Sequence, residues 1–339
     1  MNIAIIGYGY WGPNLVRNFS WLEGAHVKYV CDLSEDRLSK VKAQFPNVEI
    51  ITSDYQQILD DDSVDAIAIS TPVNTHYSLA QAALEAGKHV LVEKPMTDNV
   101  KDARALVELA EQQDRILMVD HTFLYTGAVK KIKSLIDSNE IGEVLYFDSV
   151  RVNLGLFQTD VNVLWDLAPH DISIMSYLID KKPVSVSATG VAHVNEGMEN
   201  IAYMTVFYED NTLAHFHVNW LSPIKVRQIM IGGSEKMIVY DDMQNTEKVK
   251  VYDKGVDIAP NDKDALYKTL IQYRTGDMFA PKIDETEALK DECQHFLDCI
   301  QENKQPISNG RFGLEVVKML EASQLSIKQQ GKIIELDSL

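Results

Sequence analysis

Cysteine and long apolar runs are scarce in this 339-residue sequence, and each shortage removes a class of protein. No segment approaches 18 consecutive apolar residues, so we expect no membrane-spanning helix. Cys31, Cys293 and Cys299 form no C-x-x-C pair and no cluster with histidine at zinc-site spacing. We therefore expect no metal site, and three small buried side chains in a reducing compartment. The chain opens on a strand pattern instead of a signal peptide, which predicts a cytoplasmic protein.

Basic residues are also few: 32 Lys and Arg stand against 50 Asp and Glu, for a net charge of −18. Such a surface repels nucleic acid and anionic membranes, so we expect neither as a partner. An anionic substrate would need a local basic pocket. Hydrophobic residues at 45% and charged residues at 24% are ordinary for a globular protein, and the length suits two domains.

The first 120 residues alternate short apolar runs with amphipathic helical patterns. The runs lie at residues 3–6, 27–31, 66–70, 89–92 and 116–119. They are typical of strands buried on both faces, and the alternation predicts a doubly wound parallel sheet. Later residues favour strands of an antiparallel sheet, followed by two helices near the end of the chain. We predict an α/β protein, with a Rossmann domain at residues 1–120 and an α+β domain on a mostly antiparallel sheet at residues 121–339.

A glycine motif follows the first apolar run directly, in the order Gly7-Tyr8-Gly9-Tyr10-Trp11-Gly12. Its place between a strand and a helix fits the dinucleotide fingerprint: one glycine permits a tight turn, one lets backbone approach the pyrophosphate, and one allows close helix packing. The free N–H groups at the helix start would face the phosphates. The alternative is a glycine-rich turn without a ligand.

Asp32 ends the second run, 20 positions beyond Gly12, where the fingerprint places a ribose-binding carboxylate. A carboxylate there accepts hydrogen bonds from the ribose and repels a 2′-phosphate, which favours NAD over NADP. Arg37 keeps NADP open, since it could reach a phosphate. Asp32 could instead cap the next helix, although Ser34 is available for that role.

Polar residues also follow two further strands, at the edge where ligands bind in this architecture. After the third run (66–70) the expected cofactor contacts are Thr71, Pro72, Asn74 and His76. His76 could instead cap the following helix.

Glu93-Lys94-Pro95 follows the fourth run. Lys94 there can face the nicotinamide, and Pro95 permits a cis bond. The alternative is a solvent-exposed lysine at a turn.

A second group of polar residues lies at Asp166 and His170, four positions apart, with Pro169 between them. Because proline lacks a backbone donor, we place Pro169 in the first helical turn, Asp166 just ahead of the helix and His170 within its first turn. Both side chains could then point into one cleft. The alternative makes Asp166 a cap and His170 a surface residue.

Taken in order, four motifs resemble the glucose–fructose oxidoreductase / inositol dehydrogenase (Gfo/Idh/MocA) family: the glycine motif, Thr71-Pro72, Glu93-Lys94-Pro95 and Asp166-x-x-x-His170. The resemblance covers nearly the whole chain. It implies a catalytic Lys94, a His170 positioned by Asp166, a substrate cleft between the domains, and a homodimer or homotetramer formed through the open face of the second sheet. Many members carry an Arg-Phe pair after the sixth strand, where this chain has Asp120-His121-Thr122-Phe123-Leu124, so the substrate does not follow from the family.

Residues 8–14 and 273–277 are similar to a branch that oxidises the 3-hydroxyl of UDP-linked N-acetylhexosamines or reduces keto sugars. This resemblance implies a sugar dehydrogenase acting on such a nucleotide sugar or its uronate. A free sugar or cyclitol is the first alternative, and a non-catalytic dinucleotide-sensing protein is the second. A sensor has no need for Lys94, Asp166 and His170 together, so an enzyme is favoured.

The expected chemistry is hydride transfer between a sugar carbinol carbon and nicotinamide. His170 accepts the hydroxyl proton with Asp166 holding its tautomer, and Lys94 stabilises the developing negative charge. Lys94 could itself be the base, and the sequence leaves this open. The candidates for substrate binding are His121, Arg151, Trp165, Arg227, Tyr273 and Arg274, with Trp220 as a further aromatic that could cover a ring.

Overall fold

The computed structural model describes residues 1–155, 161–258 and 271–339, with backbone alone at 255–258 and 271–274. The chain divides into two compact units: Met1–Thr126 with Thr286–Glu321, and Gly127–Glu285 with Ala322–Leu339. We predicted a single boundary near residue 120, whereas the chain returns to its first unit near residue 286. None of the described helices is both long and apolar enough to cross a bilayer.

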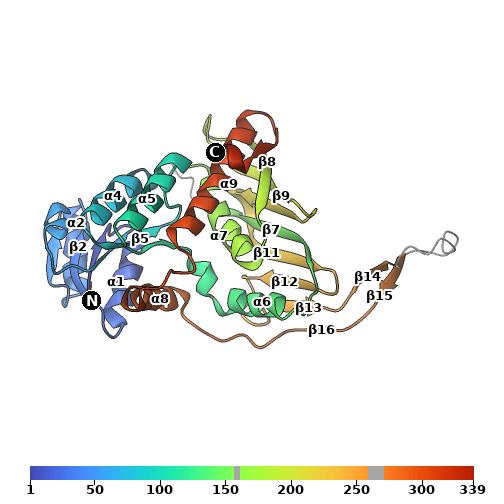
Figure 1. Ribbon diagram of the computed structural model, residues 1–339, viewed down its shortest axis with the longest axis horizontal. Helices are drawn as coiled ribbons and strands as arrows, with labels where there is room; N and C mark the ends of the chain where they lie inside the picture. The colour runs from blue at the N-terminus through green and yellow to red at the C-terminus, as the bar shows by residue number, and fades with distance from the viewer. Residues whose placement is uncertain (156–160, 259–270) are drawn as a thin grey trace. The chain divides into compact units, whose positions relative to one another are not determined.

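The first unit is built on a six-stranded parallel sheet in the order β3-β2-β1-β4-β5-β6. Figure 1 labels two of its strands, β2 and β5. Its strands are β1 (Asn2–Ile6), β2 (His26–Cys31), β3 (Ile50–Thr52), β4 (Ala66–Ile69), β5 (His89–Glu93) and β6 (Leu117–Asp120). Its helices include α1 (Gly12–Trp21), α2 (Glu35–Gln44), α3 (Gln56–Leu59), α4 (His76–Glu85) and α5 (Val100–Gln112). The doubly wound parallel sheet is confirmed. Strand order reverses between β1 and β4, where ligands bind in such sheets.

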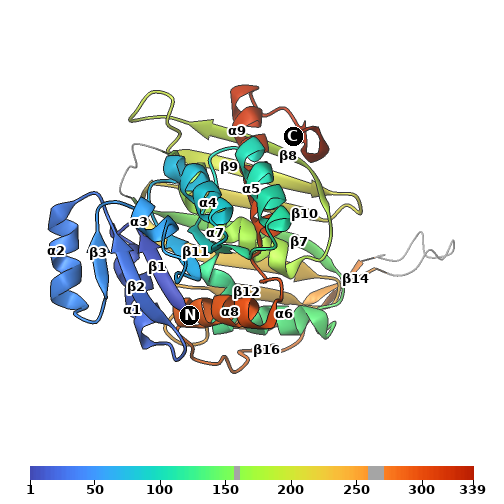
Figure 2. The ribbon, with the colours of Figure 1, turned by 60° about the vertical axis from the view of Figure 1, so that its left-hand side comes forward.

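Two late helices complete the first unit: α8 (Ala288–Glu302) and the first part of α9 (Gly310–Lys328). Helix α8 lies beside α1 in Figures 1 and 2. The start of α9 packs closely on β6, because a Cβ at Gly310 would stand 2.8 Å from the Leu117 side chain. A methyl group at Gly313 would likewise stand 2.6 Å from Val119. Such contacts between distant segments leave no local pattern in the sequence.

The second unit is built on a nine-stranded sheet in the order β16-β13-β12-β11-β7-β10-β9-β8-β17. Its strands are β7 (Val144–Leu154), β8 (Pro183–Val191), β9 (Ile201–Tyr208), β10 (Leu213–Asn219), β11 (Leu221–Gly233), β12 (Met237–Asp241), β13 (Val249–Tyr252), β16 (Met278–Phe279) and β17 (Ile334–Glu335). All pairs are antiparallel except β7 with β10. The predicted mostly antiparallel sheet is confirmed.

Helix α7 (Val163–Leu178) packs on one face of this sheet, against β7, β9 and β10 (Figure 2). Helix α6 (Gly127–Asp137) packs against α7. A separate two-stranded ribbon, β14 (Gly255–Ile258) with β15 (Ile271–Arg274), was not predicted from the sequence.

The start of α7 differs from our prediction. Asn162 caps the helix by accepting hydrogen bonds from the backbone N–H groups of Leu164 and Trp165. The helix therefore begins earlier than we inferred, and Pro169 lies inside it. Asp166 is in the first turn and His170 one turn later. The error arose because proline costs a helix one hydrogen bond, and a well-packed, mostly buried helix tolerates that loss.

Candidate functional site

The glycine loop between β1 and α1 needs glycine at three positions for three different reasons. Gly7 has φ +100°, and a Cβ there would lie 2.5 Å from the Ser70 carbonyl oxygen. A Cβ at Gly12 would lie 2.2 Å from the Gly7 carbonyl oxygen. At Gly9 the only atom a Cβ would approach is an Arg37 Nη atom, at 3.8 Å. Since the fold itself does not require glycine at this position, the open space beside Gly9 fits a dinucleotide phosphate.

Asp32 stands beside this loop at the end of β2. Its carboxylate accepts the Tyr8 backbone N–H at 2.7 Å and the Ser34 N–H at 2.9 Å, and it pairs with Arg37 at 3.3 Å. Ser34 is the residue that caps α2, so Asp32 does not serve as the helix cap. The carboxylate therefore lies where the fingerprint expects a ribose ligand.

The three remaining residues of the loop differ in what they can offer a ligand. The Tyr8 ring is buried and its hydroxyl donates to Gln44, so Tyr8 faces the loop through its backbone alone. Tyr10 is 93% exposed. Trp11 precedes α1, and its indole Nε1 donates to the Asp120 carboxylate at 2.7 Å. No local pattern predicts this last contact, because its partners are 109 residues apart.

His76 joins the two loops that follow β4 and β5. Its ring is 1% exposed, with Nδ1 2.9 Å from the Pro95 carbonyl oxygen and Nε2 2.8 Å from the Thr71 carbonyl oxygen. Both partners are acceptors, so both bonds form only when the ring is doubly protonated. Burial lowers the pKa of His76, and the two carbonyl bonds oppose that shift. His76 is thus neither a helix cap nor an exposed cofactor ligand: its buried ring lies between the loops and, when neutral, donates to one of the two carbonyls. Asn74 beside it is exposed.

Lys94 directly follows β5, and the Lys94–Pro95 peptide is cis, as Pro95 allowed. His121 follows β6 and is 2% exposed, and the charge of Lys94 acts on it. Burial, followed by the charge of Lys94, lowers the pKa of His121 to about 3. Both ring nitrogens of His121 are buried without a hydrogen-bond partner among the described residues. His121 is therefore a neutral group behind Lys94, and its burial argues against the direct substrate contact that we predicted.

In the second unit, Asp166 and His170 lie one turn apart on α7, so their side chains project from the same face of the helix. The Trp220 indole Nε1 donates to Asp166 Oδ2 at 3.1 Å. Trp220 is 1% exposed, which corrects our suggestion that its ring covers a substrate. Trp165, on α7, is also buried. We did not predict Trp220 as a partner of Asp166, because the two residues are 54 positions apart in the sequence.

Arg151 on β7 is a second correction. It is buried, and its guanidinium makes two bonds to Asp171 on α7, at 2.9 and 2.6 Å. Asp171 also accepts the Ser149 hydroxyl. Arg151 therefore ties the sheet to α7, and its burial argues against the ligand contact that we predicted.

The structure describes one of the three remaining predicted ligands. Arg227 on β11 is partly exposed and pairs with Asp242 at 3.3 Å, so it remains a candidate. The side chains of Tyr273 and Arg274 lie outside the described residues.

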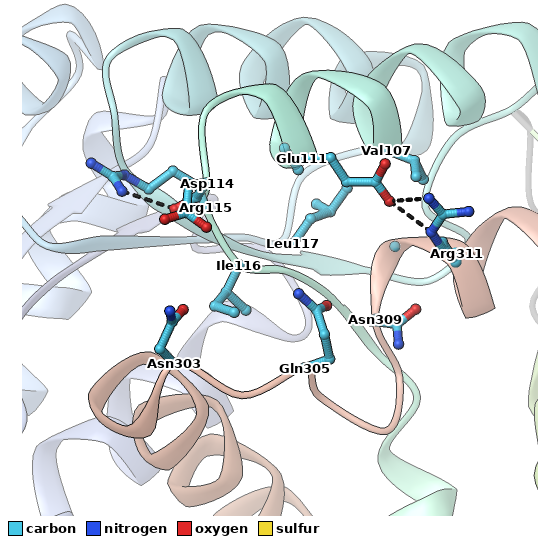
Figure 3. Close-up of a pocket in the computed structure, with 12 residues that line it drawn as sticks. Val107, Glu111, Asp114, Arg115, Ile116, Leu117, Asn303, Gln305, Asn309 and Arg311 are labelled. Atoms are coloured by element: carbon cyan, nitrogen blue, oxygen red, sulfur yellow. Dashed lines mark hydrogen bonds and ion pairs between the residues drawn. The ribbon is translucent and has the colours of Figure 1, made fainter.

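A cavity of about 250 Å³ lies in the first unit (Figure 3). It is lined by the end of α5, the start of β6 and the connection from α8 to α9, including Arg115, Leu117, Gln305 and Arg311. Because Leu117 is the first residue of β6, the cavity opens at the edge of the sheet opposite the carboxyl ends. Dinucleotides bind at the carboxyl edge, so this cavity is not the cofactor site. No group of acidic, histidine or cysteine residues in the described parts of the chain could hold a metal ion.

Comparison with known families and proteins agrees with this geometry. Residues 1–121 match the model of the oxidoreductase family with an NAD-binding Rossmann fold, and residues 129–239 match the GFO/IDH/MocA C-terminal domain. The chain is 26% identical to UDP-N-acetylglucosamine 3-dehydrogenase of Acidithiobacillus ferrooxidans, over 77% of this chain and 79% of that protein. It is 23% identical to myo-inositol 2-dehydrogenase of Thermotoga maritima, over 98% of each.

The solved structure of the A. ferrooxidans dehydrogenase superposes with a TM-score of 0.81 at 23% identity, covering 97% of this chain and 98% of that one. At this identity the superposition shows a shared fold. Both family models together span most of the sequence, and the glycine loop, Asp32 and Lys94 occupy the carboxyl edge of an NAD-binding sheet. This chain therefore belongs to the Gfo/Idh/MocA family of oxidoreductases.

Proposed function

We propose that this protein is an NAD-dependent sugar dehydrogenase that moves hydride between a sugar carbinol carbon and nicotinamide. The observation that carries the proposal is the carboxyl edge of the parallel sheet. There the glycine loop follows β1, Asp32 follows β2, and Lys94 follows β5. A Rossmann unit that only sensed the dinucleotide would have no need of Lys94 beside it or of the Asp166 and His170 pair on α7.

The preference for NAD rests on Asp32 and Arg37. The two form an ion pair in which the carboxyl side chain is 6% exposed and the guanidinium side chain 51%. A 2′-phosphate would have to approach this carboxylate. The charge of Arg37, which could pair with the phosphate, is already partly neutralised by Asp32. A ribose hydroxyl, by contrast, can donate to Asp32, whose Oδ1 accepts the Ser34 N–H and retains a lone pair.

The residues then have separate roles in the reaction. When bound, the nicotinamide supplies the hydride acceptor at C4. His170 accepts the proton from the substrate hydroxyl, and Asp166 stabilises the resulting imidazolium. Trp220 keeps Asp166 oriented by donating a hydrogen bond to it. Lys94 holds the oxygen on which negative charge develops. The reverse assignment, with Lys94 as base, predicts a different response to mutation, described below.

For the substrate we propose a UDP-linked N-acetylhexosamine or its uronate, oxidised at C3. The relative that acts on UDP-N-acetylglucosamine supports this choice, as do residues 8–14 of the glycine loop. Of the three arginines predicted to bind substrate, Arg151 pairs with Asp171 and the side chain of Arg274 lies outside the described residues, so Arg227 is our candidate for the diphosphate. A free sugar or cyclitol is the second candidate, because the inositol dehydrogenase relative aligns over 98% of the chain.

The deciding experiment measures absorbance at the NADH band with NAD and a panel of UDP-sugars, free sugars and inositols. Calorimetry with UDP in the presence of NAD is run in parallel, since a nucleotide-sugar enzyme draws binding energy from the nucleotide itself. Turnover of a UDP-sugar with UDP binding supports the proposal. Turnover of a free polyol without UDP binding moves the assignment to the second candidate. NAD binding with no turnover across the panel favours a sensor.

We also propose a homodimer or homotetramer formed through the face of the nine-stranded sheet opposite α7. Burial alternates along β9 and β10, and large apolar side chains remain exposed in the unit: Leu145, Tyr146, Tyr203 and Leu213. Analytical ultracentrifugation tests this, and a Tyr203→Glu variant should shift the protein toward the monomer.

A further inference from the structure

Two carboxyl groups of the first unit lie side by side in its interior. Asp120 ends β6 and is 2% exposed, and Glu292 lies in the first turns of α8 and is 0% exposed. Neither has a part in the function proposed above. Burying two acidic groups together is costly, so their environment has to explain how they are accommodated.

The two groups differ in their hydrogen bonds. The Asp120 carboxylate accepts the Trp11 indole N–H at 2.7 Å and the Thr122 hydroxyl. Both oxygens of Glu292 are buried without a hydrogen-bond partner while the group is ionised. Asp120 nevertheless lies within hydrogen-bonding reach of Glu292, and the Thr122 hydroxyl beside them is already donated to Asp120. Two carboxylates cannot bond each other, but a protonated Glu292 can donate to Asp120.

The surrounding charges favour the same arrangement. Burial raises the pKa of Glu292 well above its usual value, and the negative charges of Asp120 and Glu93 raise it further. Tyr125 on the short helix at Thr122–Tyr125 faces Glu292, and burial raises its pKa as well. On α8 the neighbouring thiol of Cys293 is also neutral, since burial raises its pKa.

The cation contributed by the helix packed against α8 is engaged elsewhere. Arg17 on α1 pairs with Glu287 at 3.0 Å. No lysine or arginine of the described residues forms an ion pair with Glu292. A proton is thus what satisfies Glu292. We place it on Glu292, because the Glu292 oxygens have no other hydrogen-bond partner, whereas Asp120 already accepts from Trp11 and Thr122.

Trp11 connects this pair to the cofactor loop. It precedes Gly12 at the start of α1, and no side chain caps that helix end. Its indole bond to Asp120 therefore fixes the residue at which the loop becomes the helix. The phosphate-binding N–H groups of such loops depend on that junction.

We propose that Glu292 is a positioning residue: protonated, it donates a hydrogen bond to Asp120, and the pair holds Trp11 and so keeps the glycine loop in its dinucleotide-binding conformation. The inference rests on dinucleotide binding and is independent of the sugar substrate.

The test compares NADH dissociation constants, measured by fluorescence, for Glu292→Gln, Glu292→Met and Trp11→Phe. The amide of glutamine replaces the O–H donor, so Glu292→Gln should stay within about twofold of the unmodified protein. Glu292→Met removes the donor at similar volume and should weaken binding about 3- to 10-fold, the effect of one net hydrogen bond. Trp11→Phe should weaken binding by a similar factor, and the Glu292→Met/Trp11→Phe double variant by no more than Trp11→Phe alone.

Infrared spectroscopy supplies a readout that needs no ligand. The unmodified protein at neutral pH should show the C=O stretch of a protonated carboxyl, and Glu292→Gln should lack it. An unchanged band in Glu292→Gln, or losses that multiply in the double variant, would overturn the proposal. If Glu292→Met does not fold, two measurements still test the proposal. One is the infrared comparison. The other compares Trp11→Phe with Trp11→Phe/Glu292→Gln, which should bind NADH equally. Failure of the unmodified protein to bind NADH would instead count against the proposed function.

Discussion

The candidate residues of the two units are held in place in different ways. In the first unit they follow the carboxyl ends of parallel strands, and backbone atoms hold them: Asp32 binds the Tyr8 N–H, and His76 binds the Thr71 and Pro95 carbonyls. In the second unit they project from one helix and depend on side chains distant in sequence, as Asp166 depends on Trp220. Binding of the cofactor should therefore withstand changes in the second unit, whereas chemistry should be sensitive to them.

The largest expected effect separates chemistry from cofactor binding. His170→Ala and Lys94→Ala should each lower kcat by about 100- to 10,000-fold, because each removes a group assigned to the transferred proton or the developing charge. The NADH dissociation constant, measured by fluorescence, should stay nearly unchanged in His170→Ala. If His170→Ala keeps near-normal turnover while Lys94→Ala does not, Lys94 is the base.

The buried ion pair of the second unit comes next. Arg151→Met leaves Asp171 charged and buried, and should lower the free energy of unfolding by about 3–5 kcal/mol. Thermal or denaturant unfolding measures this, and Arg151→Met/Asp171→Leu should recover much of the loss. An equal loss in Arg227→Met, whose pair with Asp242 is partly exposed, would show that burial is not the cause.

Cofactor choice tests the first unit on its own. Asp32→Ala removes the acceptor of the ribose hydroxyls and the repulsion of a 2′-phosphate. It should narrow the NAD preference in kcat/KM by about 10- to 100-fold, as expected for hydrogen bonds to a charged group. Ser34→Ala, which removes only the cap of α2, is the matched control. Equal kcat/KM for NAD and NADP in the unmodified enzyme would contradict the assignment of Asp32 as the residue that selects NAD.

A smaller change examines the support of Asp166. Trp220→Phe removes the indole donor while keeping an aromatic ring, and should lower kcat by about 3- to 10-fold, less than Asp166→Asn. The NADH dissociation constant should not move. Equal losses in affinity and kcat would mean that the two units are not separable in the way we describe.

The last prediction is a pH dependence of stability in the first unit. The pKa of Glu292 is higher in the folded chain than its usual 4.5, so the folded state binds more protons over that interval. The stabilisation is complete below pH 4.5 and is lost as pH rises through the folded pKa. Glu292→Gln does not titrate, so the Tm of the unmodified protein minus that of Glu292→Gln should fall as the pH is raised above 5. A constant difference would contradict a raised pKa.

Local patterns were enough to predict one kind of feature. The parallel strands other than β3 were found from apolar runs, and β3 was missed because three residues leave too short a signal. The glycine loop was predicted because its spacing encodes both a turn and a helix start. Asp32 followed from its distance along the chain, since a β-α-β unit fixes where the second strand ends.

Other features required contacts between distant segments. Arg151 and Trp220 looked like ligands, because a cation or an aromatic ring in a sequence does not reveal whether it is buried. The return of α8 to the first unit, and with it Glu292, had no local pattern.

The sequence by itself determined the β-α-β order, the dinucleotide loop and the residue types at the strand ends, because these depend on spacing over a few tens of residues. The tertiary structure alone decided which polar groups are paired in the interior. Trp11 meets Asp120 across 109 positions, and Arg151 meets Asp171 across a sheet and a helix. A buried charge must find its partner wherever the packed chain brings one, and that place is set by the whole fold rather than by neighbours in the sequence.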